Sequence, residues 1–189
     1  MLYIASTPHV YARLKAEIAD AIKTGRISSP ITNQEAQKLP YLQAVLYEGL
    51  RIMPSTTTGF SKRVPEGGDT ICGAFVPAGT EVYPNLRALL LDTDVYGEDV
   101  HVFRPERWLE CSAEQRALMT RPVDLLFGHG RWQCPGRTLA WMEYNKVFVE
   151  MLRNFDVQIA RPERPWVLKA YSALVISDFG ILLREGRLG

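Results

Sequence analysis

The sequence predicts a mainly α-helical fold with small β-sheets, an α+β arrangement. Apolar residues recur at helical spacing in three long segments: 8–24, 40–52 and 137–155. Three shorter segments are rich in β-branched or apolar residues and lie beside turn residues: 55–58, 70–83 and 175–183. With 47% hydrophobic and 23% charged residues, the 189-residue chain can bury a sizeable core. We therefore expect one domain, residues 1–189.

The charge and the cysteines exclude several classes of protein. The formal net charge is +1, so neither nucleic acid nor an anionic membrane surface is expected as the main partner. The three cysteines, Cys72, Cys111 and Cys134, are widely separated and form no C-x-x-C pair. This pattern argues against a disulfide framework and a structural zinc site, and it indicates a reducing, intracellular compartment.

The beginning of the chain is apolar but does not resemble a targeting segment. Residues 1–5 have neither the basic flank nor the long apolar core of a signal peptide. No run in the chain approaches the roughly 18 to 20 apolar residues that span a bilayer, so we expect no transmembrane segment. The apolar opening stops at Ser6-Thr7-Pro8, as the end of an earlier helix would. We expect the chain to continue a longer protein.

Two helices are predicted in the first third of the chain. The first has Thr7 as its N-cap and Pro8 at its first position, where the missing proline N–H is harmless. Its apolar residues repeat every fourth position until Gly25 ends it: Val10, Leu14, Ile18 and Ile22. Residues 26–39 are polar and rich in turn formers. The second helix, 40–52, is apolar almost all round, which predicts that it is buried.

Glu48 and Arg51 lie three residues apart on this second helix, on one stripe of its surface. On an ordinary helix they would form an exposed ion pair worth little. Here we expect a buried pair, because the helix offers little surface to solvent. Buried charges must be paired and hydrogen-bonded, and Arg51 has more donors than one carboxylate can occupy. Further partners for Arg51 are therefore expected.

The middle and the end of the chain are predicted to form strands and loops. Residues 55–58 have the character of an edge strand, and a turn at 77–79 separates two more strands, which places Cys72 in a strand. Residues 93–126 show little periodicity and are predicted to form a long ordered meander. Residues 175–183 are predicted to form a terminal strand or hairpin.

Cys134 stands in a glycine-rich loop directly before the third long helix. Gly128, Gly130 and Gly136 permit backbone conformations that a Cβ would forbid, so the loop is predicted to be neither strand nor helix. The helix begins near Arg137. Unpaired N–H groups and the positive end of the helix dipole favour a negatively charged sulfur at this place.

Three roles for Cys134 are open from these residues alone. It could be a small buried hydrophobe, as many single cysteines are. It could be a reactive nucleophile, for which His129 is the only nearby candidate base. It could be an axial metal ligand, with the glycines leaving room for a large flat cofactor and Phe127 as an apolar wall.

The loop resembles the signature F-x-x-G-x-R-x-C-x-G of the cytochrome P-450 haem-thiolate monooxygenases. Four positions match: Phe127, Gly130, Cys134 and Gly136. Ala140 and Glu143 fit the A-x-x-E that often follows in that family. One position departs, because Trp132 stands where the family usually has arginine or histidine, and Arg131 is shifted by one. Trp132 donates one N–H and carries no charge, so the usual contact to a haem propionate is expected to be weakened or replaced.

Two further motifs stand in the order of the family. Glu48 and Arg51 match its E-x-x-R motif. Residues 103–108 match its P-E-R element, and the resemblance makes Arg107 the third partner in a structural ion network. A second Pro-Glu-Arg occurs at 162–164, but only the first lies between the E-x-x-R and the cysteine.

Two other positions bear on the resemblance. Arg63 fits the family's arginine that contacts a haem propionate, the alternative being a solvated surface arginine. Where many relatives carry a His-Arg pair before an aspartate, this chain has Leu90 and Leu91. That change removes two polar side chains and puts local packing or cofactor contacts in question.

The resemblance implies the C-terminal part of the family's fold, similar to fungal microsomal members of the pisatin-demethylase type. It implies a non-covalently held heme b (iron protoporphyrin IX) with the Cys134 thiolate as ligand to the metal. The other residues implied at the cofactor are Arg63, Phe127, Gly130, Trp132 and Gly136. Full-length relatives insert one oxygen atom of O2 into an apolar small molecule. They take electrons from an NADPH-cytochrome reductase and are anchored in the endoplasmic-reticulum membrane.

The distal helix of that family, with its oxygen-activating acid and threonine, has no counterpart in this sequence, and neither has the membrane anchor. No catalytic residue is therefore identified, and we expect the chain as given to be a truncated and inactive form. One alternative is a non-catalytic remnant or binding module without haem. A cysteine-nucleophile hydrolase that uses His129 is the less favoured alternative.

Overall fold

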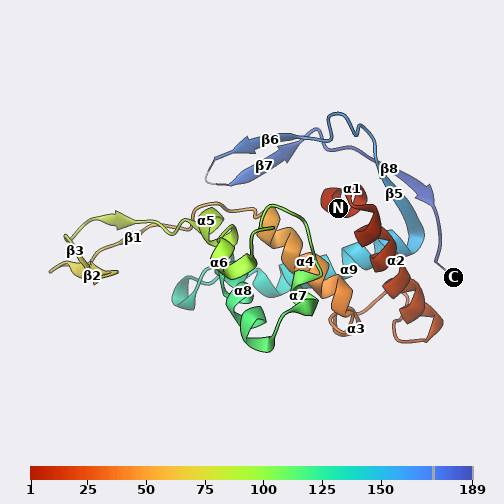
Figure 1. The fold of residues 1–189 in the computed structure, drawn as a ribbon, viewed down its shortest axis with the longest axis horizontal. Coiled ribbons are helices and arrows are strands. Elements are labelled where there is room, and N and C mark those ends of the chain that lie inside the picture. The colour runs from red at the N-terminus through yellow and green to blue at the C-terminus, as the bar shows by residue number, and fades with distance from the viewer. Residues whose placement is uncertain (172, 189) are drawn as a thin grey trace.

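The structure is a computed structural model that describes residues 1–171 and 173–188. Four longer helices form its body (Figure 1): α2 (Pro8–Lys23), α4 (Pro40–Ile52), α8 (Ala113–Leu125) and α9 (Arg137–Asn154). The shorter helical segments are α1 (Leu2–Ser6), α3 (Asn33–Ala36), α5 (Leu86–Leu90), α6 (Thr93–Tyr96), α7 (Arg107–Glu110) and the 3₁₀ turn η1 (Gly130–Trp132). None of the described helices is long and apolar enough to cross a membrane.

The strands form small antiparallel pairs at the periphery. Two pairs form a lobe at one end of the molecule: β1 (Lys62–Arg63) with β4 (Glu81–Val82), and β2 (Asp69–Ile71) with β3 (Ala74–Val76). Two further pairs border the helices (Figure 1): β6 (Val167–Ala170) with β7 (Leu174–Ser177) runs above them, and β5 (Phe155–Ile159) with β8 (Ile181–Glu185) lies at the end away from the lobe. The predicted α+β class is confirmed.

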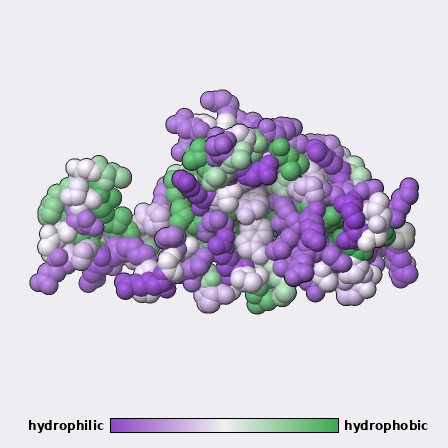
Figure 2. All heavy atoms as spheres, turned by 90° about the horizontal axis from the view of Figure 1, so that it is seen from below, coloured by the Kyte–Doolittle hydropathy of each residue, from purple (hydrophilic) through white to green (hydrophobic). Residues whose placement is uncertain are grey.

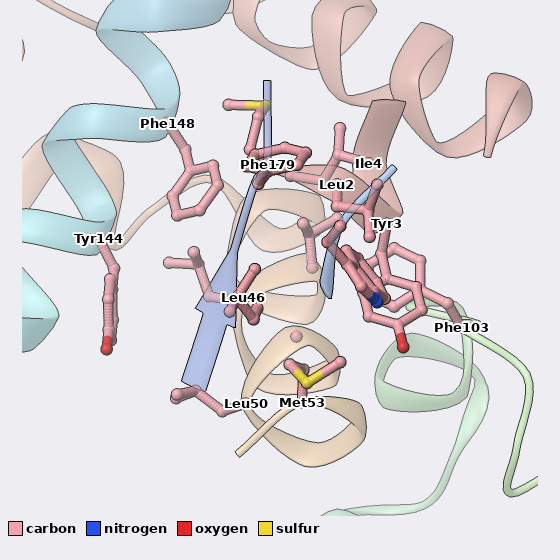
Figure 3. Close-up of a pocket in the computed structure, with 15 residues that line it drawn as sticks. Leu2, Tyr3, Ile4, Leu46, Leu50, Met53, Phe103, Tyr144, Phe148 and Phe179 are labelled. Carbon is pink, nitrogen blue, oxygen red and sulfur yellow. The ribbon is translucent and has the colours of Figure 1, made fainter. Parts of the chain in front are cut away.

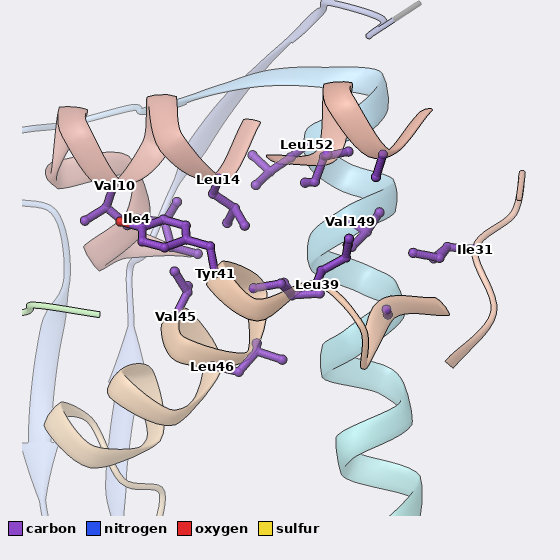
Figure 4. Close-up of a cluster of buried hydrophobic side chains, with 14 of the residues drawn as sticks. Ile4, Val10, Leu14, Ile31, Leu39, Tyr41, Val45, Leu46, Val149 and Leu152 are labelled. Atoms are coloured by element: carbon purple, nitrogen blue, oxygen red, sulfur yellow. The ribbon is translucent and has the colours of Figure 1, made fainter. Parts of the chain in front are cut away.

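The first two predicted helices are present, and both end where the sequence indicated. Val10, Leu14 and Ile18 of α2 have no exposed surface, and Ile22 is partly buried. They pack in one cluster with residues of α4 and α9, of which Leu152 is fully buried (Figure 4). A second cluster lies on the other side of α4 and includes Ala44, Leu90, Tyr96, Trp108 and Met119. Because α4 contributes to both clusters, its all-round apolar character is explained.

The predicted strand at residues 70–76 is wrong in one respect, because the chain turns in its middle. Cys72 and Gly73 have φ of 51° and 81°, and they form the two-residue turn between β2 and β3. A tight hairpin favours positive φ at both central positions, since this backbone twist matches the twist of the strands. Cys72 is therefore an exposed turn residue. The turn at 77–79 joins strands of two different sheets.

Two other strand predictions need correction. Within the described part of the chain, residues 55–58 make single bridges, Thr56 with Ala173 and Thr58 with Asn85, rather than a regular strand. For residues 175–183 the hairpin alternative is wrong, because β7 pairs with β6 whereas β8, the terminal strand, pairs with β5. Asp178, with φ of 58°, lies between β7 and β8, where the chain passes from one sheet to the other.

The predicted meander at residues 93–126 contains the helix α8, which sequence periodicity missed. Only Met119 and Val123 of its residues are buried, so its apolar pattern is weak. Its start carried a clearer signal, because the Ser112 side chain accepts a hydrogen bond from the Gln115 backbone N–H over 3.2 Å. Pro122 lies inside the helix.

The structure brings Glu48, Arg51 and Arg107 together in the interior. Glu48 and Arg51 have no exposed surface, and Arg107 is 3% exposed. Arg51 donates to both Glu48 oxygens, from Nε to Oε2 over 2.9 Å and from Nη2 to Oε1 over 2.7 Å. Arg107 Nε donates to Glu48 Oε1 over 3.1 Å, and Trp108 Nε1 donates to Glu48 Oε2 over 2.9 Å. The carboxylate is thus held by two cations, one indole and the Arg104 backbone N–H, which donates to Oε1 over 2.9 Å.

The two guanidinium groups also bind the chain that leads to α7. Arg51 donates to the carbonyl oxygens of Leu90, Val100 and Val102 over 2.7–3.2 Å. Arg107 Nη1 donates to the Asp99 carboxylate over 2.8 Å, and its Nη2 donates to the Val102 carbonyl over 3.3 Å. The Leu90 side chain is fully buried in the second cluster. The network therefore fastens residues 90–102, which have little other regular structure, onto α4.

Replacing Glu48 tests how much this network stabilises the fold. Glu48→Gln keeps the size of the side chain but leaves two buried guanidinium groups without their shared anion, so we expect a loss of about 3–5 kcal/mol. Urea unfolding followed by far-ultraviolet circular dichroism measures the free energy. Arg26→Ala is the control, since its ion pair with Asp20 is exposed and should contribute about 0–1 kcal/mol. Equal effects of the two substitutions would contradict the expectation.

Glu106, at the start of α7, links that segment to α2 and α4. Tyr41 Oη donates to Glu106 Oε1 over 2.7 Å, and Arg13 Nη1 donates to the same oxygen over 3.1 Å. The Arg13 guanidinium carbon lies 4.3 Å from the centre of the Tyr41 ring. Burial raises the pKa of Glu106, but the hydrogen bond from Tyr41 and the charge of Arg13 outweigh it. The pKa of Glu106 is therefore below its ordinary value.

This lowered pKa predicts a pH-dependent contribution to stability. A carboxyl group whose pKa falls on folding stabilises the protein above its unfolded pKa of about 4.3 and loses that effect as the pH falls through the folded pKa. Glu106→Gln should therefore lower the free energy of unfolding at neutral pH, and the difference should shrink below about pH 4. Urea unfolding at a series of pH values measures it. The exposed Glu98→Gln should show a small difference at every pH. If the difference in free energy of unfolding between the parent chain and Glu106→Gln grew in acid, the lowered pKa of Glu106 would be contradicted.

Candidate functional site

The candidate site is the loop at residues 127–136, between α8 and α9. The Cys134 backbone N–H donates to the Phe127 carbonyl over 2.7 Å, which closes the loop. Gly128 has φ of 73°, and a Cβ there would lie 2.6 Å from the Trp132 carbonyl oxygen, so no other residue fits. Gly130 also has a positive φ, 58°, at the start of η1. The backbone therefore fixes where the cysteine stands.

The Cys134 thiol is exposed and lies directly before the longest helix described. Gly136 is the N-cap of α9, and a Cβ on it would lie 3.6 Å from the Cys134 sulfur. The sulfur therefore lies beside the first turn of this 18-residue helix. One of the three roles left open by the sequence, a buried hydrophobic cysteine, is thereby excluded.

A polar cavity of about 560 Å³ lies beside the sulfur, between α3, α4 and the first turns of α9. Tyr47 and Trp141 contribute its aromatic walls. Three of its amide side chains are hydrogen-bonded in a row: Gln43 Nε2 donates to Asn145 Oδ1, and Asn145 Nδ2 donates to Asn33 Oδ1, each over 2.8 Å. These amides, which sequence reasoning did not single out, hold the wall of the cavity in one arrangement.

The Trp132 side chain is 61% exposed and lies among cations. The Lys62 ammonium is 4.6 Å from its ring centre, and the Arg131 guanidinium carbon is 5.0 Å from it. Lys62 belongs to β1, so this contact joins the β1–β4 lobe to the cysteine loop. The next residue, Arg63, has a side chain that is 74% exposed, with a long ion pair of 3.7 Å to Glu81. No pattern around Lys62 predicts this contact, because it depends on how the fold brings β1 to the loop.

The same lobe is also where apolar side chains face solvent. Figure 2 shows hydrophobic surface on it. Phe60 and Phe75 are 88% and 69% exposed. Hydrophobic side chains are also exposed on α9 beyond the cysteine: Leu139, Met142 and Val147. The site therefore combines an exposed thiol, cations and uncovered apolar surface.

A nucleophilic role for Cys134 receives no support from its neighbours. His129 is exposed, and the hydrogen bonds among the described residues include none between His129 and Cys134. The described residues also contain no cluster of three or more His, Cys, Asp or Glu that could hold a metal. A metal at Cys134 would therefore take its other ligands from a chelating cofactor. One exposed cysteine in a glycine-lined loop fits that requirement.

A second cavity, of about 260 Å³, lies between α1, α4 and α9 (Figure 3). Its walls are mostly apolar, with Leu46 and Leu50 from α4, Met53 directly after it, and Tyr144 and Phe148 from α9. The described residues that line it include none from the 127–136 loop. It is therefore separate from the cavity beside Cys134.

Comparison with known proteins agrees with the resemblance seen in the motifs. The family model for cytochrome P450 matches residues 1–178. Cytochrome P450 monooxygenase ABA1 of Pyricularia oryzae is 45% identical over 179 residues, which are 94% of this chain and 35% of that protein. The Botryotinia fuckeliana aba1 monooxygenase is 42% identical over 185 residues, 98% of this chain and 36% of that protein.

A pisatin demethylase of Fusarium vanettenii is 36% identical over 166 residues, which are 88% of this chain and 31% of that protein. The chain thus spans about a third of the length of these relatives. The predicted likeness to this group is confirmed, and the family match runs through the helices, the lobe and the cysteine loop alike. The chain belongs to the cytochrome P450 family.

Proposed function

We propose that this chain is the haem-binding part of a monooxygenase that adds one oxygen atom of O2 to an apolar organic molecule. The observation that carries the proposal is the exposed Cys134 thiol, fixed by a loop that only glycine permits and placed at the start of α9. Membership of the cytochrome P450 family gives this thiol a specific partner, haem. The b-type, non-covalently held form is part of the proposal.

The residues of the loop would hold the cofactor from one side. Cys134 would be the protein's ligand to the metal, and Phe127, Gly130 and Gly136 would leave an apolar surface that a flat ring can approach. The cations at Arg63, together with Lys62 and Arg131 around Trp132, would bind the carboxylates of the haem. When bound, the thiolate-ligated haem would supply oxygen activation, because donation from the sulfur favours O–O cleavage.

The remaining parts of the proposal concern partners. Electrons would come from an NADPH-cytochrome reductase, and the substrate would be an apolar small molecule. One relative is named a pisatin demethylase. Residues 1–189 contain no identified acid and threonine to deliver protons to oxygen. We therefore propose that the chain as given captures haem weakly and does not turn over substrate.

Haem capture tests the proposal directly. The full 189-residue chain, titrated with haem, reduced and exposed to carbon monoxide, should give the red-shifted absorption band of a thiolate-ligated haem. Cys134→Ser should lose this band, because a hydroxyl does not supply a thiolate. Cys72→Ser should keep it, since Cys72 lies exposed in the β2–β3 turn. Absence of the band from the parent chain, with folding intact, would favour a remnant or binding module without haem.

The cation cluster around Trp132 predicts two opposite changes in haem affinity. Trp132→Arg should tighten binding by about 1 kcal/mol, roughly fivefold in Kd, because a charge-assisted hydrogen bond to a carboxylate is added. Arg63→Ala should weaken binding by a similar factor. Quenching of the chain's tryptophan fluorescence by added haem measures Kd. Trp132→Leu is the control, because it removes the indole without adding a charge. If Trp132→Leu bound haem as tightly as Trp132→Arg, the result would count against a role for charge.

A further inference from the structure

The polar cavity beside Cys134 has hydrogen-bonding groups that its own side chains leave unused. Both N–H groups of the Gln43 amide are spent, one on the Ala36 carbonyl over 3.0 Å and one on Asn145 Oδ1 over 2.8 Å. Asn33 Oδ1 accepts from Asn145. The hydrogen bonds of the described residues include none to Gln43 Oε1 and none from Asn33 Nδ2. The wall therefore offers an acceptor and a donor on side chains that are already held in place.

These unused atoms are accessible rather than sealed inside the protein. Within the described part of the chain, the buried side-chain atoms that lack a partner belong to Glu106 and Arg153, and neither residue lines the cavity. Tyr47 and Trp141 do line it, and no hydrogen bond is described for the hydroxyl of the first or the indole N–H of the second. Both groups are accessible too. A molecule in the cavity can bind such groups without first breaking a bond within the protein.

The charge on the cavity wall is balanced. Among the described residues that line the cavity, Arg137 is the one member of the Asp, Glu, Lys and Arg group. Its Nη2 donates to the Asp124 carboxylate over 2.6 Å, so its charge is already compensated. A charged ligand would lose hydration here without meeting an unpaired charge of opposite sign, which is unfavourable. The cavity therefore suits a neutral molecule.

The aromatic part of the wall restricts the shape of such a molecule. The Tyr47 and Trp141 ring centres are 4.8 Å apart, and the rings are tilted by 45°. Because the two rings contact each other, a flat ligand such as a nucleobase cannot stack between them. A pyranose ring needs one aromatic face for its C–H groups, and its hydroxyls both donate and accept, so they match amide groups of either kind. The cavity volume of about 560 Å³ lies within the roughly 300–1,000 Å³ of small-molecule sites.

We propose that this cavity is a binding site for a neutral saccharide, with one pyranose ring against Trp141 and its hydroxyls bound to Gln43 Oε1 and Asn33 Nδ2. The amide row holds these groups in place before the sugar arrives, so little conformational freedom is lost on binding. Cys134 also lines the cavity, so a bound sugar covers it from that side. Binding of the sugar requires no haem and is independent of the proposed function.

Calorimetric titration of the full 189-residue chain tests the binding. The probes are the methyl pyranosides of glucose, galactose and mannose, and we expect at least one of them to bind saturably. The matching methyl uronide, which has a carboxylate in place of the hydroxymethyl group, should bind roughly tenfold more weakly, because the wall offers no unpaired cation. Failure of all three pyranosides to bind the folded chain, or equal binding of the uronide, would overturn the proposal. These titrations use the parent chain, so they remain decisive if a variant does not fold by circular dichroism.

Two tryptophan variants and the cysteines locate the bound sugar. Trp141→Leu should weaken binding roughly tenfold, because the aromatic face is lost. Trp166→Leu is the control, since Trp166 lines the apolar second cavity, and it should bind as the parent does. At ten times its Kd the sugar should slow alkylation of Cys134 by iodoacetamide roughly tenfold, because only the free protein reacts. Alkylation of Cys72, in the β2–β3 turn, should keep its rate. Equal binding by the two tryptophan variants, or no preferential protection of Cys134, would overturn the site. Because no haem is added, either result is independent of haem capture.

Discussion

The burial of one carboxylate between two guanidinium groups is the constraint on which most of this structure depends. Glu48 and Arg51 have no exposed surface, and Arg107 is nearly as deep. Each charge is stable there only because the others, the Trp108 indole and several backbone carbonyls complete its hydrogen bonds. A network of this kind permits one arrangement of α4, α7 and residues 90–102 and excludes the alternatives, because any other arrangement would leave a buried charge unpaired.

The network also connects the fold to the candidate site. Trp108 binds Glu48 on one side and packs against Tyr47 on the other, and Tyr47 lines the cavity beside Cys134. The helix α4 carries both Glu48 and Tyr47, so the position of the ion network and the position of the cavity wall are set by the same helix. The apolar faces of α4 then pack it between the two hydrophobic clusters.

The sequence predicted the long helices well because their signals were local. Pro40 and the apolar run after it defined α4, and the glycines around Cys134 with the repeat after Arg137 defined the loop and α9. The helix α8 was missed because it buries few residues. The turn at Cys72 was missed because cysteine is not a usual residue at positive φ.

The parts of the site that could not be predicted are contacts between distant segments. Nothing near Lys62 indicates that its ammonium lies over Trp132, and nothing near Gln43 indicates its bond to Asn145. Such pairs follow from how the helices pack and which strands pair, and a pattern within one segment carries no information about them. The family motifs gave the identities of Glu48, Arg51 and Arg107, whereas the carbonyl partners of the two arginines came only from the structure.

The close approach at Gly128 has a consequence for how the loop can evolve. Its shape is imposed by main-chain atoms, namely the Gly128 α-carbon against the Trp132 carbonyl and the Cys134 amide against the Phe127 carbonyl. The indole of Trp132 points largely into solvent and contributes nothing to that closure. Two positions four residues apart thus differ sharply in the substitutions they tolerate. Position 128 admits only glycine, whereas position 132 can carry either arginine or tryptophan without a change in the backbone.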